Sequence, residues 1–156
     1  MTYNQTSDDK WYFAYGSNLL EDQKEERTGD IRKAIKCYLP EYKFVFNKRG
    51  SCGEIYANIL PDDNEKVWGV IYLCNPEAIK EMDVSEGVAG GHYHHIDVEV
   101  IKDDGERVSA MTYEAGSDYI VLDGKPSKEY LKKIIEGTEN HGLPEDYIQY
   151  IENIST

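Results

Sequence analysis

The 156-residue sequence lacks any apolar run near the roughly 18 residues that a membrane span requires. It also lacks an excess of positive charge, because 17 Lys and Arg stand against 30 Asp and Glu, which gives a formal net charge of −13 at pH 7. Nucleic acids and anionic membranes bind basic surfaces. The composition therefore argues against both as partners, and an anionic small molecule would need locally placed donors.

Cysteine is scarce, and its three occurrences form no recognisable pair. Cys37, Cys52 and Cys74 are odd in number and contain no CxxC spacing, so neither a disulfide scaffold nor a zinc ribbon is predicted. Phosphate-binding motifs are missing as well, since neither GxGxxG nor GxxxxGK[ST] occurs between a strand and a helix. We therefore expect no cofactor and no metal, and a reducing, cytoplasmic location.

The remaining composition is that of one globular domain. Hydrophobic residues make up 40% and charged residues 30% of the chain, which is ordinary usage. Residues 1–10 are polar and acidic, and we expect them to be a short flexible lead before a single domain at 11–156. The 13 tyrosines suit the wall of a polar small-molecule pocket, although tyrosine is also a common strand residue.

Alternating and β-branched segments dominate the first two thirds of the sequence. We predict strands at about 11–15, 31–37, 42–47, 54–59, 67–74, 93–101 and 107–114. Helices are predicted at 76–84 after Asn75, at 128–139 after Ser127, and from Pro144 to 154. An acidic stretch at 19–27 is helical or irregular, and a last strand could lie within the long loop 115–126. This order predicts an α+β domain rather than a βαβ alternation.

Two features could carry chemistry. The turn Gly16-Ser17-Asn18 follows a predicted strand, and such a turn can direct consecutive backbone N–H groups toward a carboxylate or an oxyanion. Glu86 stands directly before Gly87 at a predicted helix end rather than on a solvated helical face. A carboxyl group in an aromatic pocket can act as an acid and a base near neutral pH. Taken singly, the turn is a weak signal that is more simply explained by a structural role, and Glu86 is one of 30 acidic residues.

Taken together, the segments resemble the γ-glutamylcyclotransferase family. The resembling segments are WYFAYGSNLL at 11–20, VWGVIYL at 67–73, MDVSEGVAGGHY at 82–93, PSKEY at 126–130 and GLPEDY at 142–147. They occur in the family's order at compatible spacing and extend over nearly the whole predicted domain. The resemblance implies a small mixed β-barrel with flanking helices and with the loop and the glutamate at its mouth.

The resemblance also implies roles for individual residues. Glu86 would be the catalytic acid and base. The substrate-binding residues implied are Tyr12, Phe13, Ala14, Tyr15, Gly16, Ser17, Asn18 and Tyr130, with Tyr93 and Tyr119 as further pocket residues. The activity implied is that of an acyltransferase or lyase that releases an amine or amino acid from a γ-glutamyl group. In that reaction the α-amine attacks the γ-carbonyl carbon and 5-oxoproline forms.

Several alternatives stay open. Asn18 after Gly-Ser resembles the branch that acts on γ-glutamyl amino acids more than the glutathione-specific branch. The same chemistry could remove a γ-glutamyl protecting group from a biosynthetic intermediate. A non-catalytic binding module of the same fold is a further alternative, which the presence of Glu86 disfavours. The oligomeric state is open and includes a homodimer.

Two groups of basic residues invite other interpretations. His92, His94 and His95 could suggest a metal site, but the strand period favours ordinary strand residues. Lys48 and Arg49 could receive an anionic substrate tail, and we expect them to be surface charges instead.

Overall fold

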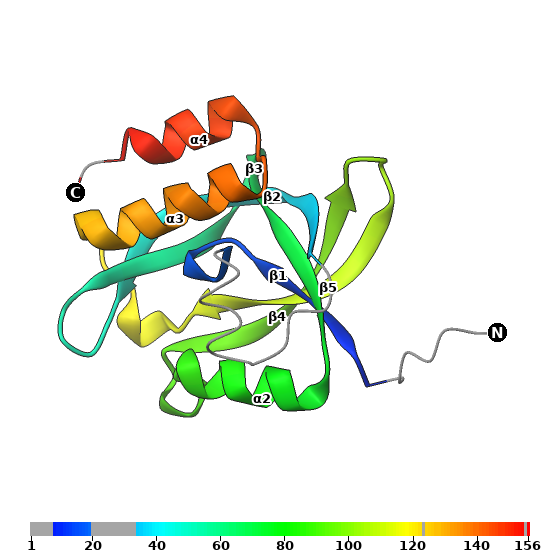
Figure 1. Cartoon of the computed structure of the whole chain (residues 1–156). Helices are drawn as coiled ribbons and strands as arrows, with labels where there is room; N and C mark the ends of the chain where they lie inside the picture. Colours follow the sequence, from blue (N-terminus) through cyan, green and yellow to red (C-terminus); the bar gives the residue numbers. More distant parts are fainter. Residues whose placement is uncertain (1–7, 20–33, 123, 155) are drawn as a thin grey trace.

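The computed structural model describes residues 8–19, 34–122, 124–154 and 156. Its elements are β1 (Lys10–Ala14), η1 (Ser17–Leu19), β2 (Ala34–Arg49), β3 (Ile55–Cys74), α2 (Pro76–Ser85), η2 (Val88–Gly90), β4 (Tyr93–Lys102), β5 (Arg107–Ala115), η3 (Ser117–Tyr119), α3 (Lys128–Asn140) and α4 (Glu145–Glu152). The described strands form a closed barrel in the order β1-β3-β2-β4-β5. Helices α3 and α4 lie side by side on one side of it, and α2 lies on the opposite side (Figure 1). The predicted α+β barrel with flanking helices is confirmed.

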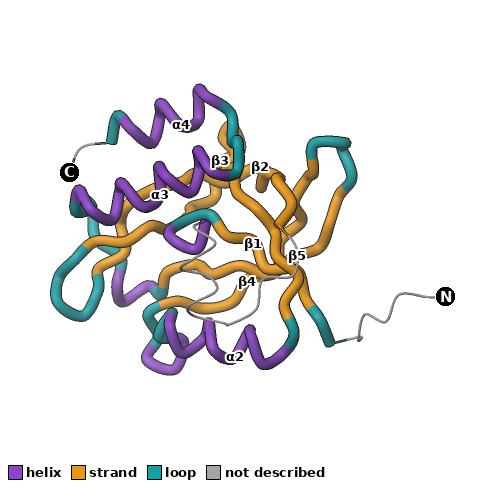
Figure 2. Tube along the Cα trace, in the orientation of Figure 1, coloured by secondary structure: helices purple, strands orange, loops and turns teal. Residues whose placement is uncertain are grey.

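Two long strands replace four predicted short ones. β2 and β3 pair antiparallel along most of their length (Figure 2), with register shifts at Pro40/Tyr42 and at Phe46/Lys48. Glu41, between the first two of these residues, has a positive φ of 66°. A bulge of this kind lets a strand bend and continue past a proline. The prediction of separate strands at 31–37 and 42–47, and at 54–59 and 67–74, was therefore wrong about the breaks between them, because Pro40 stands at a bulge and Pro61 pairs with Tyr42 within the ladder. Residues 31–33 lie outside the described residues.

The first strand closes the barrel. β1 pairs antiparallel with β3 over Lys10 to Ala14 and parallel with β5 at Tyr12 and Met111. The Thr112 hydroxyl, from β5, donates a hydrogen bond of 2.8 Å to the carbonyl oxygen of Phe13. Because β1 ends at the Gly16-Ser17-Asn18 turn, this pairing fixes where the turn begins.

Side-chain caps set the predicted helix starts. Asn75 accepts a hydrogen bond of 2.8 Å from the Ala78 N–H at the start of α2, and Ser127 accepts one of 3.1 Å from the Tyr130 N–H at the start of α3. Such caps satisfy N–H groups that the first helical turn leaves without partners. Both helices confirm the prediction to within a residue or two, and α4 confirms the last one.

The remaining connections differ little from prediction. β4 and β5 form the predicted hairpin around the Asp103–Gly105 turn. In the loop 115–126, the described residues hold η3 and a single bridge between Lys48 and Ile120 in place of a further strand. The lead at 1–7 and nearly all of the acidic stretch 19–27 lie outside the described residues. Across the described ranges, no helix is both long and apolar enough to cross a membrane.

Candidate active site

A cavity of about 910 Å³ opens at one end of the barrel. Of the residues predicted to form a site, those that line it are Tyr12, Tyr15, Gly16, Ser17, Asn18, Glu86, Tyr93 and Tyr130. Three predicted residues are not among the lining residues. Phe13 and Ala14 are fully buried in the core, and Tyr119 stacks on the His92 ring with 4.0 Å between ring centroids.

The turn after β1 is held by the side chains around it. The Leu19 N–H donates to the Gly16 carbonyl oxygen at 3.0 Å, which closes the turn. The buried Asn18 amide donates to the Tyr12 hydroxyl at 2.9 Å. From α3, His141 Nε2 donates to the Leu19 carbonyl oxygen at 2.7 Å. The turn is thus tied to its own strand and to a helix 122 residues away in sequence.

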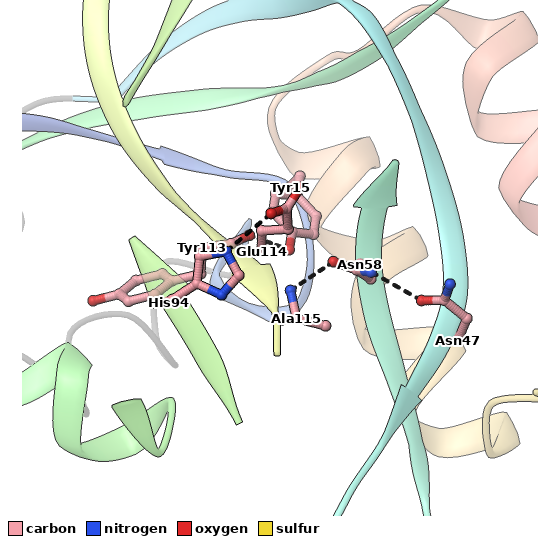
Figure 3. A network of polar contacts seen from close by, with 7 residues as sticks. All are labelled: Tyr15, Asn47, Asn58, His94, Tyr113, Glu114 and Ala115. Atoms are coloured by element: carbon pink, nitrogen blue, oxygen red, sulfur yellow. Dashed lines mark hydrogen bonds and ion pairs between the residues drawn. The ribbon is translucent and has the colours of Figure 1, made fainter. Parts of the chain in front are cut away.

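Tyr15 connects this turn to the far strands of the barrel. Its hydroxyl donates a hydrogen bond of 2.7 Å to the Tyr113 carbonyl oxygen on β5 (Figure 3). Burial, together with the negative charge of Glu86, raises the pKa of Tyr15 well above 10. The Tyr15 hydroxyl therefore stays protonated near neutral pH and remains a donor.

Side-chain amides continue the same network through β3. Asn58 Oδ1 accepts from the Ala115 N–H at 2.9 Å, and Asn58 Nδ2 donates to Asn47 Oδ1 at 3.0 Å (Figure 3). Asn58 is fully buried, so these bonds satisfy polar groups that would otherwise destabilise the fold. The network fixes the positions of β2, β3 and β5 beside the cavity.

Glu86 stands at the carboxyl end of α2. Its N–H donates to the Met82 carbonyl oxygen at 2.8 Å, and Gly87 follows with a positive φ of 64°, which ends the helix. One turn earlier, Asp83 Oδ1 accepts from the Tyr113 hydroxyl at 2.6 Å and contacts His95 Nε2 at 2.5 Å. These two contacts attach α2 to β4 and β5, and so hold Glu86 against the barrel.

Two tyrosine hydroxyls form hydrogen bonds with the backbone of the same β3 residue, one at its carbonyl oxygen and the other at its N–H. The Tyr93 hydroxyl donates to the Ala57 carbonyl oxygen at 2.7 Å, and the Ala57 N–H donates to the Tyr130 hydroxyl at 3.2 Å. Burial is the main cause that raises the pKa of Tyr93 well above 10. Both side chains are therefore fixed parts of the cavity wall, and Tyr93 keeps its hydroxyl proton near neutral pH.

Lys48 corrects the expectation of a surface charge. Only 3% of the residue is exposed, and its side chain lines the cavity, whereas Arg49 is exposed as predicted. Along β2, Phe44, Phe46 and Lys48 are alternate residues, and all three are buried. The period of two that defines a strand face was the signal that could have placed Lys48 inward.

Comparison with known proteins identifies the family to which the chain belongs. The model of the AIG2-like family matches residues 66–151. The chain is 31% identical over 148 residues to gamma-glutamylcyclotransferase of Bos taurus, an alignment that covers 92% of this chain and 77% of the bovine protein. The chain belongs to the γ-glutamylcyclotransferase family. Identity to the Homo sapiens protein of the same name is 30% with the same coverage.

Solved structures of the γ-glutamylcyclotransferase family share the fold. One gamma-glutamyl cyclotransferase superposes with a TM-score of 0.87 at 28% identity, covering 94% of this chain and 88% of that chain. A yeast gamma-glutamyl cyclotransferase specific to glutathione superposes with a TM-score of 0.68 at 14% identity. The second similarity concerns the fold alone. The predicted family and fold are confirmed.

The three neighbouring histidines of this family member have separate partners. His92 Nδ1 lies 2.6 Å from Lys48 Nζ, His94 Nε2 lies 2.9 Å from Glu114 Oε1, and His95 contacts Asp83. Within the residues that the structure describes, no group of three or more His, Cys, Asp and Glu side chains is placed to hold a metal ion.

His92 gives the site a pH-dependent element. Burial and the nearby charges of Lys48 and Arg49 lower the pKa of His92 below its usual 6.5. Between the lowered and the usual pKa, the unfolded chain binds more protons than the folded one. The contribution of neutral His92 to stability is therefore complete above about pH 6.5 and is lost as the pH falls through this window.

We predict that the stability difference between wild type and His92→Asn shrinks on acidification. Asparagine can accept a hydrogen bond from Lys48, but it does not titrate. Urea unfolding of both proteins at about pH 7.5 and about pH 5 measures the difference, and taking the difference cancels the effects of the other carboxylates. A difference that stays constant or grows at the lower pH would contradict the assignment.

Proposed function

We propose that the protein is a γ-glutamylcyclotransferase in which Glu86 acts as acid and base and the turn at 15–18 binds the glutamyl part of the substrate. The observation that carries the proposal is that this turn and Glu86, about 70 residues apart in sequence, line one cavity. Neutral tyrosines form much of the wall between them. The products are 5-oxoproline and a free amine or amino acid.

The reaction needs little besides positioning and one proton carrier. The substrate carries its own nucleophile, since its α-amine can reach the γ-carbonyl carbon and close a five-membered ring. The Glu86 carboxylate removes a proton from the α-ammonium group, and the new C–N bond forms. The Glu86 carboxylic acid then returns that proton to the departing nitrogen as the old C–N bond breaks. The attacking nitrogen loses its second proton to water as the lactam forms, and the released amine takes one proton up from water, so the protons balance.

The roles of the other lining residues follow from their hydrogen bonds. Tyr15 and Tyr93 both have a raised pKa, so their hydroxyls stay protonated near neutral pH. Each hydroxyl donates a hydrogen bond to a backbone carbonyl oxygen. They therefore shape the cavity and do not compete with Glu86 for protons. Backbone N–H groups of the 15–18 turn are suited to bind the α-carboxylate or the developing oxyanion.

A substrate panel tests the proposal. Purified protein is incubated with γ-glutamyl amino acids, γ-glutamylamines and glutathione, and 5-oxoproline is measured against the Glu86→Gln variant. We expect product from at least one member of the panel. If no substrate gives more product than the variant does, the proposed activity fails and the alternative of a binding module with the same barrel gains support.

The space around Gly16 gives a second test of the binding turn. A Cβ atom added at Gly16 would lie 3.4 Å from Ala57 Cβ and 3.6 Å from the Tyr130 hydroxyl, which is ordinary contact distance. Gly16→Ala should therefore fold and turn over substrate. The branched side chain of Gly16→Val extends further into the cavity, so we expect kcat/KM to fall by about tenfold to a hundredfold. Kinetics of Gly16→Val that match those of Gly16→Ala would show that substrate does not approach this turn.

A further inference from the structure

The ammonium group of Lys48, at the edge of the cavity, lies near three tyrosine rings, of which Tyr56 and Tyr93 line the cavity. The distances from Nζ to the ring centroids are 4.9 Å for Tyr119, 5.1 Å for Tyr93 and 5.8 Å for Tyr56. These separations are in the range where an aromatic face attracts a cation. Among the residues that the structure describes, the Lys48 ammonium is therefore held by aromatic rings and not by a carboxylate.

The hydrogen bond to His92 orients this cation. His92 Nδ1 lies 2.6 Å from Lys48 Nζ, and since the ammonium can only donate, Nδ1 is the acceptor. His92 in turn stacks on Tyr119 at an interplanar angle of 24°. An ammonium has three N–H donors, and among the described residues His92 is its one hydrogen-bond partner.

A buried cation without an ion pair is costly. In the part of the chain that the structure describes, no aspartate or glutamate lies within ion-pairing distance of Lys48, although the charges of Glu86 and Glu54 act on it from further away. Burial of a charge destabilises a protein unless a partner compensates. The Lys48 side chain borders the cavity, so an anion bound there would supply the missing partner.

We propose that Lys48 is a specificity-determining residue that binds a carboxylate on the leaving amine, and this inference rests on the proposed function. Under that function the 15–18 turn binds the α-carboxylate of the glutamyl part. Glu86 lines the same cavity as Tyr15 in that turn and as Lys48. The carboxylate left for Lys48 is the one on the departing amino acid, so anionic leaving groups are preferred over neutral ones.

Two substrates that differ only by a carboxylate isolate this contact. γ-Glutamyl-alanine and γ-glutamyl-ethylamide release alanine and ethylamine, and both give 5-oxoproline. A hydrogen bond to a charged group contributes enough for roughly a tenfold to a hundredfold preference. We expect wild type to prefer γ-glutamyl-alanine by that factor in kcat/KM, and Lys48→Met to lose most of the preference while its activity on the ethylamide changes much less.

Lys133 provides the matched control, because its side chain also borders the cavity but is exposed on α3. Lys133→Met should keep the wild-type preference, and Lys48→Arg should keep more of it than Lys48→Met does. The inference is overturned if wild type shows no preference, or if Lys133→Met and not Lys48→Met removes it. It is also overturned if Lys48→Met lowers kcat/KM equally for both substrates, because that result would assign Lys48 to the glutamyl carboxylate. If wild type gives no 5-oxoproline from either substrate, the proposed function fails and this inference with it.

Discussion

Glu86→Gln should lower kcat by at least about a hundredfold while the protein stays folded, since general acid–base catalysis contributes a factor of this size or more. Glutamine has nearly the same shape as glutamate, but it can neither take the proton from the substrate α-ammonium nor return one to the leaving amine. The helix end should survive, because the Glu86 backbone N–H, and not the side chain, donates to the Met82 carbonyl oxygen. Single-turnover and steady-state rates of 5-oxoproline release measure the loss.

Glu54 is the control for this substitution. It also borders the cavity, but its Oε1 accepts a hydrogen bond of 3.0 Å from the Cys52 N–H in the turn between β2 and β3. Glu54→Gln retains an oxygen that can accept that bond, and it should cost far less turnover than Glu86→Gln. Normal turnover in Glu86→Gln would remove this residue from the mechanism, and equal losses in both variants would point to general charge depletion of the cavity.

Gly69→Ala should destabilise the barrel by about 3 kcal/mol, the upper range for overpacking a core. A Cβ atom at this position of β3 would lie 2.2 Å from the Ala14 carbonyl oxygen and 2.8 Å from the Phe13 ring. The carbonyl belongs to a backbone that is paired with β3 on one side and with β5 on the other, so it cannot move without loss of those pairs. Urea unfolding monitored by circular dichroism gives the change in free energy of unfolding.

Gly90→Ala is the matched substitution at a position with room. The added Cβ would lie 3.6 Å from His92 Cδ2, an ordinary contact, and Gly90 does not have a positive φ. Its free energy of unfolding should stay within about 0.5 kcal/mol of wild type. Two alanine variants of equal stability would mean that β1 and β3 separate more readily than their pairing indicates.

The sequence predicted elements well where a local signal defines them. Asn75 and Ser127 are N-cap residues whose side-chain bonds are local, and both predicted helix starts are correct. Strand ends were harder to predict, because a proline such as Pro40 ordinarily interrupts the hydrogen-bond ladder of a sheet. Here the bulge at Glu41 carries the strand past it. Whether a proline ends or bends a strand depends on the partner strand, which local sequence does not specify.

For the candidate site, too, residues within local motifs were predicted, and residues placed by distant contacts were missed. The motifs around Gly16 and Glu86 predicted segments that line one cavity, and the family resemblance supplied that connection. Lys48 and Tyr113 border the same cavity but were missed, since Lys48 stands beside Arg49 in a stretch that looks like a basic surface. Lys48 is buried because the rings of Tyr93 and Tyr119, more than 40 residues away in sequence, lie next to it. Local sequence patterns do not reveal contacts between residues so far apart in the chain.

The closure of the barrel between Tyr12 and Met111 has a consequence for the order of events during synthesis. β1 leaves the ribosome first, yet its partners on β3 and β5 follow only after some 60 to 100 further residues have been made. Contacts so distant in sequence form late and slow the folding of β proteins. The segment that ends in the Gly16-Ser17-Asn18 turn must therefore stay unpaired with β3 and β5 until those strands have been made.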